Sequence, residues 1–591
     1  GSNDSKPDHS FFSCIAMLFA AGMGIGLMYF GVAEPLSHYA NNVFEGNHYV
    51  SKAKNAQLYT FFHWGIHAWA VYGLVGLSLA YFSYRYKLPM SLRSCLYPLL
   101  KNKINGRWGD SIDVFALCST FFGITTTLGF GVIQINSGLK TLNLLPETSF
   151  KYQIGIVCVL VSLAVFSAAS GVNKGIKLLS NINIVAAICL LIFVLMLGPT
   201  VYLIGSFTDG LGNYISNFFN ITFNTHVYEE KTLPWFYDWT ILYWAWWISW
   251  APFVGLFIAR ISKGRTIKSF IGAVLIIPTL FNFMWMIVFG NSAIWMDFHV
   301  AEAALSKLVD FPDELMFRFL DYLPFSTFSS SLVIAIVIIF FMTSADSGIL
   351  VLDSIATKNS NTSPLWQKIF WGLLLMLLSL ILLNAGGLKA LQTMTLITAL
   401  PFSVIMLLFV ASLLKALLID HKYYERRYSV STIPWSGEFW KQRLKQILAL
   451  KTKDSVEKFI SETVLKAFEE LQAEFAASDI KLKINRRERP VGLELEIAHN
   501  TVNNFKYGVE CHNTVVSDLM VEEQNLPEHN ETNVFIPKTF FGDSREGYDV
   551  QYFTKNELIS DVLKQYERFL SIVSDEKNEL FISSNANREA T

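Results

Sequence analysis

Residues 239–253 read Trp-Thr-Ile-Leu-Tyr-Trp-Ala-Trp-Trp-Ile-Ser-Trp-Ala-Pro-Phe, a run that contains five tryptophans and no charged side chain. On a helix, four of its aromatic residues form one stripe, with Trp247 beside it: Trp239, Tyr243, Trp246 and Trp250. Tryptophan is common at membrane interfaces, which can explain Trp239. The later tryptophans lie deeper in the segment. The run therefore predicts a membrane helix with an aromatic face.

A second aromatic run occupies residues 62–72, Phe-His-Trp-Gly-Ile-His-Ala-Trp-Ala-Val-Tyr. Trp64, Tyr72 and Trp69 lie at about 0°, 80° and 140° around a helix, so they share one side over about two turns. Tryptophan faces bind cations well, and aromatic cages recognise quaternary ammonium groups. Packing between helices explains any single tryptophan, but the whole constellation favours a cage. We expect no glutamate to pair with it, so a cation carrying its own carboxylate would suit the site.

The composition divides the chain into a membrane part and a soluble part. Of 591 residues, 52% are hydrophobic and 16% are charged, against about 25% charged in soluble domains. Residues 420–591 hold 52 charged side chains and residues 1–419 only 43. Apolar stretches long enough to cross a bilayer predict ten membrane helices. We place them near 11–33, 58–84, 112–139, 153–170, 179–206, 239–259, 267–290, 329–354, 366–386 and 390–418.

The distribution of lysine and arginine predicts the orientation. The connection 85–111 carries six of them, whereas 207–238, expected to be a loop, carries one. Because basic loops stay in the cytoplasm, Gly1 and the tail are expected there. A net charge of −1 argues against a nucleic-acid partner. We expect a membrane core over 1–419, a juxtamembrane linker over 420–452 and a cytoplasmic domain over 453–591.

The first predicted span contains three alternating glycines, Gly22, Gly24 and Gly26. Glycine inside a helix costs about 1 kcal/mol relative to alanine. Three in five residues favour local unwinding, which would free backbone groups for an ion or an anion. The alternative is close helix packing, because Gly22 and Gly26 also form a GxxxG face. The following Glu34-Pro35 pair is expected to end the helix.

Polar side chains cluster in the eighth predicted span. Thr343 and Ser344 are adjacent hydroxyls, and Asp346 is a carboxylate near membrane depth. Hydroxyls and freed carbonyls suit Na⁺, although the hydroxyls can also bond back to their own helix. Asp346 can pair with a basic residue such as Arg260. His63 and His67 are four residues apart, but no third ligand is evident, so a transition-metal site is not expected.

Together these motifs resemble the betaine/carnitine/choline transporter family. The resemblance is carried by the glycine motif with Glu34-Pro35, by 62–72, by 244–253, by Ala259-Arg-Ile-Ser-Lys-Gly-Arg265 and by Thr343-Ser-Ala-Asp-Ser347, and it spans roughly residues 10–420. It implies an all-α polytopic protein with a LeuT-like five-plus-five inverted repeat, followed by a small α+β domain. The family has twelve helices, so this chain is expected to lack two peripheral N-terminal ones.

The resemblance also implies site residues. The substrate cage would use Trp64, Trp69, Tyr72, Trp246, Trp247 and Trp250. One sodium site would use Ala20 and Met23 with Phe340, Thr343 and Ser344; Na⁺ is the only metal expected. A second sodium site is doubtful, because Thr120 and Phe253 match it but Ile124 replaces a threonine and cannot coordinate a cation. Choline-specific members carry aspartate where this chain has Gly26, which favours a zwitterion such as glycine betaine.

The sequence therefore predicts a transporter that imports a quaternary ammonium osmolyte, with glycine betaine as the first candidate, coupled to Na⁺. A proton-driven choline transporter and an osmolyte-binding sensor are the alternatives. No nucleophile–base constellation suggests an enzyme, and no cofactor is expected. The resemblance implies a homotrimer in the bacterial cytoplasmic membrane.

In the tail, 420–450 is basic and could contact anionic lipid. Helices are predicted over 453–476 and 555–573, with strands near 480–487, 492–499, 505–511, 533–540 and 548–553. The resemblance, here to the family's choline carriers, implies a regulatory role.

Overall fold

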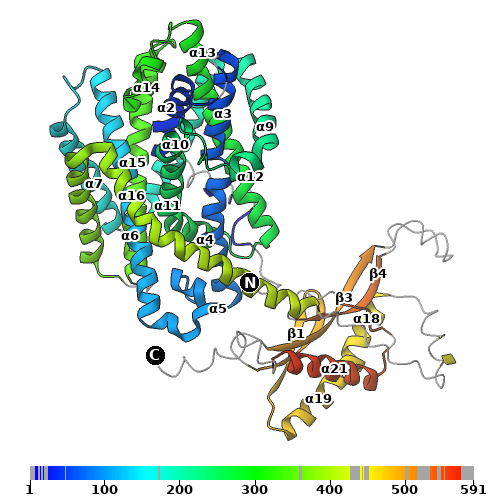
Figure 1. Cartoon of the computed structure of the whole chain (residues 1–591). Coiled ribbons are helices and arrows are strands. Elements are labelled where there is room, and N and C mark those ends of the chain that lie inside the picture. The colour runs from blue at the N-terminus through cyan, green and yellow to red at the C-terminus, as the bar shows by residue number, and fades with distance from the viewer. Residues whose placement is uncertain are drawn as a thin grey trace. The chain divides into compact units, whose positions relative to one another are not determined.

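The computed structural model describes residues 7–10, 14, 17–18, 24–44, 46, 48–170, 173–357, 363–425, 440–441, 444, 452–499, 504–515, 533–541, 547–551 and 553–573. The chain divides into two compact units (Figure 1). The first extends from Lys6 to Leu413 and is helical, and the second begins at Leu414. The first unit contains both aromatic runs, so it carries the candidate site.

The helical unit is built from long helices joined by short ones (Figure 1). The long helices are α2 (Ile25–Ala40), α3 (Tyr49–Trp64), α4 (Ile66–Arg85), α6 (Arg107–Thr141), α7 (Phe150–Ser170), α8 (Asn173–Leu197), α9 (Thr200–Phe223), α11 (Leu242–Ile261), α12 (Ile267–Met286), α15 (Ser326–Ala356) and α16 (Leu365–Glu425). The short ones are η1 (Leu92–Leu96), α5 (Tyr97–Leu100), η2 (Lys101–Asn105), α10 (Thr232–Trp235), η3 (Phe236–Ile241), η4 (Ile287–Asn291), α13 (Ser292–His299), η5 (Ser306–Leu308) and α14 (Pro312–Leu320).

Eight helical segments among the described residues are long and apolar enough to cross a membrane. Seven of them correspond to single predicted spans, from 58–84 to 329–354. The eighth, Leu365–Leu418, contains both of the last two predicted spans. There, Gly386 and Gly387 leave helical geometry, and the φ of +55° at Gly387 suits a residue without a side chain. The count of ten separate helices and the inverted repeat remain predictions.

Two predicted helix boundaries were wrong. The first helix does not end at Glu34-Pro35: α2 continues through Pro35 to Ala40. The span 179–206 is interrupted, because α8 ends at Leu197 and α9 begins at Thr200, on either side of Gly198-Pro199. Helix α9 then occupies much of 207–238, which was expected to be a loop. Proline lacks a backbone N–H, and this explains why the helix restarts at this point.

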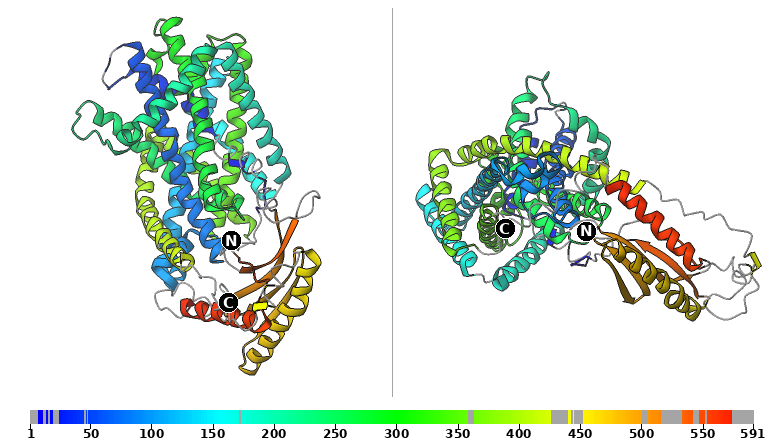
Figure 2. Two further views of the ribbon diagram at one scale, coloured as in Figure 1. Left: turned by 90° about the vertical axis from the view of Figure 1, so that its right-hand side faces the viewer. Right: turned by 90° about the horizontal axis from the view of Figure 1, so that it is seen from below.

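The helices next to the aromatic runs form the centre of the unit. Helix α11 packs along α4 and α6, and α15 packs along α6, α7 and α8. Helix α2 contacts α3, α6 and α14. The two views in Figure 2 show these helices running side by side, and Figure 1 places α13 and α14 at one end of the unit and α5 at the other. Residues far apart in sequence therefore meet between α2, α4, α11 and α15.

The second unit is a four-stranded antiparallel sheet covered by helices. The strands follow one another in the order β1 (Leu482–Glu488), β2 (Val491–Ile497), β3 (Phe505–Val515) and β4 (Asn533–Phe541). The helices are α18 (Lys453–Phe459), η7 (Ile460–Val464), α19 (Leu465–Ala477) and α21 (Lys555–Val573). Alternate residues Leu493, Leu495 and Ile497 join apolar helix residues such as Phe468 in one core.

Most of the secondary structure predicted for the tail is present. The helix expected over 453–476 is formed by α18, η7 and α19, and α21 matches 555–573. The strand expected over 548–553 was wrong, because Asp549 forms only an isolated bridge to Lys538. The predicted lipid-binding segment over 420–450 lies largely outside the described residues, although α16 continues to Glu425.

Candidate substrate and ion site

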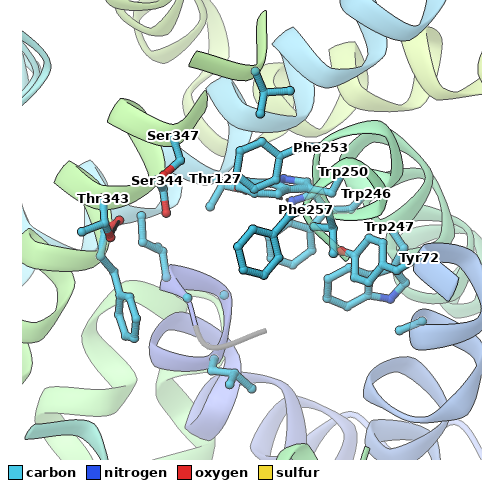
Figure 3. Close-up of a pocket in the computed structure, with 18 of the residues that line it drawn as sticks. Tyr72, Thr127, Trp246, Trp247, Trp250, Phe253, Phe257, Thr343, Ser344 and Ser347 are labelled. Carbon is cyan, nitrogen blue, oxygen red and sulfur yellow. Dashed lines mark hydrogen bonds between the residues drawn. The ribbon is translucent and has the colours of Figure 1, made fainter. Parts of the chain in front are cut away.

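A cavity of about 360 Å³ lies between α2, α4, α11 and α15. Its lining includes every residue of the predicted cage and three residues of the predicted sodium site: Trp64, Trp69, Tyr72, Trp246, Trp247, Trp250, Phe340, Thr343 and Ser344. Figure 3 shows the aromatic side chains of α11 on one side of the cavity and Thr343, Ser344 and Ser347 of α15 on the other. Residues predicted from separate motifs thus surround one space.

The aromatic rings of the cage meet mostly edge to face. Trp64 and Trp247 are T-shaped with centroids 5.1 Å apart, and Tyr72 meets Trp247 in the same way at 6.0 Å. Trp246 instead stacks on Trp247, with centroids 5.0 Å apart. Several ring faces therefore enclose the same space, and this arrangement suits a cation that has no N–H to donate.

The chain break at Gly65 orients the cage. The predicted span 58–84 is not one helix, because α3 ends at Trp64 and α4 begins at Ile66. A helix end leaves carbonyl groups without helical partners. Here the indole N–H of Trp247 donates to the carbonyl oxygen of His63 at 2.9 Å, and the amide of Asn282 donates to that of Trp64 at 3.1 Å. The freed carbonyls thus hold α11 and α12 against the cage.

One hydroxyl fixes the two remaining cage tryptophans of α11. Thr127 of α6 accepts the indole N–H of Trp246 at 3.0 Å and that of Trp250 at 2.9 Å. Trp250 also donates to the carbonyl oxygen of Gly123 at 3.0 Å. The sequence analysis did not identify Thr127, which sits in a run of three threonines at 125–127. The feature that could have identified Thr127 as a site residue is its position as a polar side chain on a long apolar helix.

The glycine motif reaches the cavity at its C-terminal end. Gly24 is extended, with φ −156° and ψ −172°, and precedes the first residue of α2. Gly26 is helical and packs against the rings of Trp246 and Trp64. Both glycines line the cavity. The residues Ala20, Gly22 and Met23, also predicted for this segment, lie outside the described residues.

On the α15 side of the cavity, Thr343 bonds back to its own helix, which the sequence analysis named as the alternative to Na⁺ binding. The Thr343 hydroxyl donates back to its own helix, with the carbonyl oxygens of Ile339 at 3.0 Å and Phe340 at 3.2 Å. A hydroxyl that donates in this way keeps a lone pair for a cation. For the doubtful second site, Phe253 lines the cavity, whereas Thr120 is buried outside its lining.

A second, smaller cavity of about 130 Å³ lies behind the cage. Its walls include Phe30, Trp239, Tyr243 and Trp246, with Asp238 at the margin. Trp246 lines both cavities. An aromatic layer therefore separates two spaces, and the larger of these extends to Arg260 at the opposite end of α11.

The expectation that no glutamate pairs with the aromatic cluster was wrong. Glu34 is fully buried, and its Oε2 accepts the indole N–H of Trp64 at 2.6 Å and a hydrogen bond from the Tyr243 hydroxyl. Its Oε1 lies 2.7 Å from Nδ1 of His63 and 3.3 Å from Nε2 of His38. A carboxylate that is fully buried in a membrane protein is itself a signal of function. The prediction instead treated Glu34 as part of a helix end, because Pro35 follows it.

The other polar residues singled out from the sequence do not join the cage. His67 hydrogen-bonds Thr222 at 2.9 Å, so it does not share a site with His63. Asp346 is buried outside the cavity lining and forms no ion pair with Arg260 in the described part of the chain. His38, His63 and Glu34 do offer metal-type ligand atoms within 4.8 Å of one another. Those atoms already hydrogen-bond one another.

Comparison with known proteins identifies the family. A family model described as betaine/carnitine/choline family transporter matches residues 1–422. The chain belongs to the betaine/carnitine/choline transporter family. A glycine betaine transporter of Acinetobacter baylyi is 43% identical over 97% of this chain and 86% of its own length. The high-affinity choline transport protein of Escherichia coli K12 is 35% identical, with coverages of 97% and 86%.

A third relative is an uncharacterized transporter of Haemophilus influenzae, 49% identical over 98% of this chain and 87% of its own length. Like the others, it is a transporter and not an enzyme, in agreement with the sequence analysis. The family resemblance is thus confirmed, and the apolar helices make this chain a multi-pass membrane protein. The matches to the Haemophilus influenzae and Acinetobacter baylyi relatives cover 98% and 97% of this chain, so the similarity extends beyond residue 422 into the tail.

Proposed function

We propose that this chain imports a quaternary ammonium osmolyte, with glycine betaine as the first candidate, by Na⁺-coupled alternating access. One observation carries the proposal: the aromatic cage and the hydroxyls of α15 line the same cavity. A trimethylammonium group binds to ring faces, and Na⁺ binds to oxygen atoms. Substrate and ion can therefore bind side by side, as coupling requires.

Glycine betaine suits the charges of this cavity. Its described lining contains no aspartate or glutamate and one cationic side chain, Arg260. A zwitterion brings its own negative charge, whereas choline does not. The absence of a carboxylate at Gly26 and the greater similarity to the glycine betaine relative support the same choice.

The aromatic layer supports alternating access. Trp246 lies between the two cavities and lines both. Movement of this ring and its neighbours would connect the cage to either side in turn. The positive-inside rule supports a bacterial cytoplasmic membrane location with the Arg260 end of α11 and the tail on the cytoplasmic side. A homotrimer and a regulatory tail are further parts of the proposal that follow from family membership, and contact with anionic lipid follows from the basic residues of 420–450.

Proton-coupled choline import is the second candidate, and one observation favours it. Glu34 places a buried carboxylate directly behind Trp64. A negative charge at this position would stabilise a substrate with a net positive charge, and a carboxylate can carry a proton. An osmolyte sensor would use the same cage without moving its ligand.

Uptake into proteoliposomes tests the proposal. Labelled glycine betaine and labelled choline are each offered with an inward Na⁺ gradient, and then with K⁺ in place of Na⁺ and an imposed proton gradient. We expect glycine betaine accumulation only with Na⁺. Choline accumulation with protons alone would select the second candidate. Binding of either ligand without accumulation would select the sensor.

A further inference from the structure

Glu34 is surrounded by hydrogen-bond donors on its own helix and on two other elements. Its carboxylate is reached by His63 and Trp64 at the end of α3, by Tyr243 on α11 and by His38 one turn further along α2. All five side chains are buried. Trp64 lines the larger cavity and Tyr243 the smaller one. The carboxylate therefore lies between the walls of both cavities.

The neighbours of the two histidines favour one arrangement of the ring protons. The indole N–H of Trp235 lies 3.1 Å from Nδ1 of His38, which must accept, so the ring proton is on Nε2 and points to Glu34. Nε2 of His63 lies 2.9 Å from the hydroxyl of Thr240, a fully buried group with no other hydrogen-bond partner among the described residues. If that hydroxyl did not donate, its proton would be unpaired, at a cost in stability.

With Thr240 donating, His63 accepts at Nε2 and carries its proton on Nδ1, which donates to Glu34. Both imidazoles are then neutral, and Glu34 receives four donors, which is the pattern of an ionised carboxylate. In the described part of the chain, Glu34 forms no ion pair with a lysine or an arginine. The cluster thus holds one uncompensated negative charge inside the membrane unit, where such a charge is costly unless it has a role.

We propose that Glu34 is a positioning residue and the counter-charge of the cage, and that it makes the cage favour a quaternary ammonium group over a neutral group of the same shape. The inference rests on the proposed function and deepens it. The carboxylate holds the edge of Trp64, whose ring lines the cage, at 2.6 Å. It lies at the edge of this ring, so the indole of Trp64 would separate it from an ammonium group bound in the cage. An indole whose N–H donates to an anion also presents a more negative face to a cation.

Binding to the purified full-length protein tests this inference, with intrinsic tryptophan fluorescence as the readout. The probes are choline, glycine betaine and 3,3-dimethylbutan-1-ol, in which carbon replaces the nitrogen of choline and removes the charge. We expect Glu34→Gln to weaken choline binding about tenfold or more. Binding of the neutral alcohol should change less than about twofold, with glycine betaine in between, because its carboxylate offsets the ammonium charge.

Two further variants make the test specific. Glu34→Asp keeps the charge but withdraws it by one methylene, so the preference for choline over the alcohol should fall only about twofold. This variant decides the question if Glu34→Gln does not fold, since complete loss of the preference although the charge is retained would then overturn the inference. Asp297→Asn is the matched control, because Asp297 is equally buried but bonds to Leu305 and Ser306 instead of the cage.

The possible results distinguish failure of the role proposed for Glu34 from failure of the proposed transport function. If Glu34→Gln weakens choline and the neutral alcohol equally, Glu34 only supports the structure and the inference is wrong. If Asp297→Asn alters the preference as Glu34→Gln does, the effect is not specific to this carboxylate and the inference is again wrong. If the unmodified protein binds neither choline nor glycine betaine, the proposed function itself fails.

Discussion

Gly26 lies directly against Trp246: a Cβ atom added to Gly26 would come within 2.7 Å of Cη2 of that indole and 3.1 Å of Cη2 of Trp64. The nearest ring must therefore move if any side chain is placed at this position. Gly24 provides a contrast, because a Cβ there would meet nothing within 4 Å and its φ of −156° is open to all residues.

We therefore expect Gly26→Ala to weaken substrate binding about tenfold, since it displaces Trp246 from the cage, and Gly24→Ala to have little effect. A tenfold weaker affinity corresponds to a loss of about 1.4 kcal/mol of binding free energy, within the range of energies that overpacking a well-packed site costs. Half-saturation for glycine betaine uptake would be measured for both variants. Equal values for the two would show that Gly26 does not shape the cage.

Thr127 offers a second test, because it is the hydrogen-bond partner of two cage tryptophans. Thr127→Val keeps the shape but removes the acceptor of Trp246. Trp250 retains its bond to the carbonyl of Gly123. An indole N–H left unpaired in a buried site costs about 1 to 3 kcal/mol.

We expect weaker substrate binding and a shifted tryptophan emission for Thr127→Val, and near-normal values for Thr127→Ser, which keeps the hydroxyl. Fluorescence titration of both variants gives the comparison. A valine variant with unchanged affinity would mean that Trp246 holds its position without this bond.

The break at Gly65 can be tested through stability. A Cβ on Gly65 would lie 2.5 Å from the carbonyl oxygen of Phe61 and 2.9 Å from the ring of Phe283. Because the first contact is with backbone, a side-chain rotation cannot relieve it. We expect Gly65→Ala to destabilise the protein by about 1 to 3 kcal/mol. Gly73→Ala on the same span is the control, since its Cβ would meet Val274 at an ordinary 3.5 Å. Thermal denaturation of both purified variants would separate them.

The cage was predictable from the sequence because helical periodicity alone places its members on one face. Trp64 and Tyr72 meet Trp247, and Trp69 meets Tyr72 and lines the same cavity, although the break at Gly65 interrupts their helix. The spacing of these residues predicts that they share one face, and the break at Gly65 does not change that. An isolated glycine inside a helical pattern is usually tolerated, so Gly65 alone was no reason to divide that span.

The role of Glu34 was not predictable by the same reasoning. Its partners lie 30 and 209 residues away in the sequence, at Trp64 and Tyr243. Only tertiary packing brings them together. The adjacent Pro35 supplied a strong local signal for a helix end, but α2 continues through it. A buried carboxylate with many donors is a property of the folded protein, and periodicity does not reveal it.

The tail domain contains a buried polar cluster, and we expect the loss of one of its hydrogen bonds to destabilise this domain alone. The Tyr507 hydroxyl donates to the buried Asp561 at 2.7 Å, and Tyr548 bonds to the same carboxylate. We expect Tyr507→Phe to destabilise the domain by about 1 to 3 kcal/mol. Tyr566→Phe serves as the control, because Tyr566 contributes ring contacts to the same core. Limited proteolysis of the full chain should cleave the first variant faster within 453–573; equal rates would contradict the assigned role.

The hydroxyls of α15 provide the test of ion coupling. Thr343 and Ser344 line the cavity opposite the cage, and Ser347 lines it one turn further along the helix (Figure 3). If Thr343 and Ser344 bind Na⁺, replacing either with alanine removes an oxygen ligand. We expect the Na⁺ concentration for half-maximal uptake to rise about tenfold, which corresponds to about 1.4 kcal/mol. Ser347→Ala, which also removes a cavity hydroxyl, should leave it unchanged. A rise of the same size in all three variants would point to a general change in cavity polarity, and no rise in Thr343→Ala and Ser344→Ala would place the ion elsewhere.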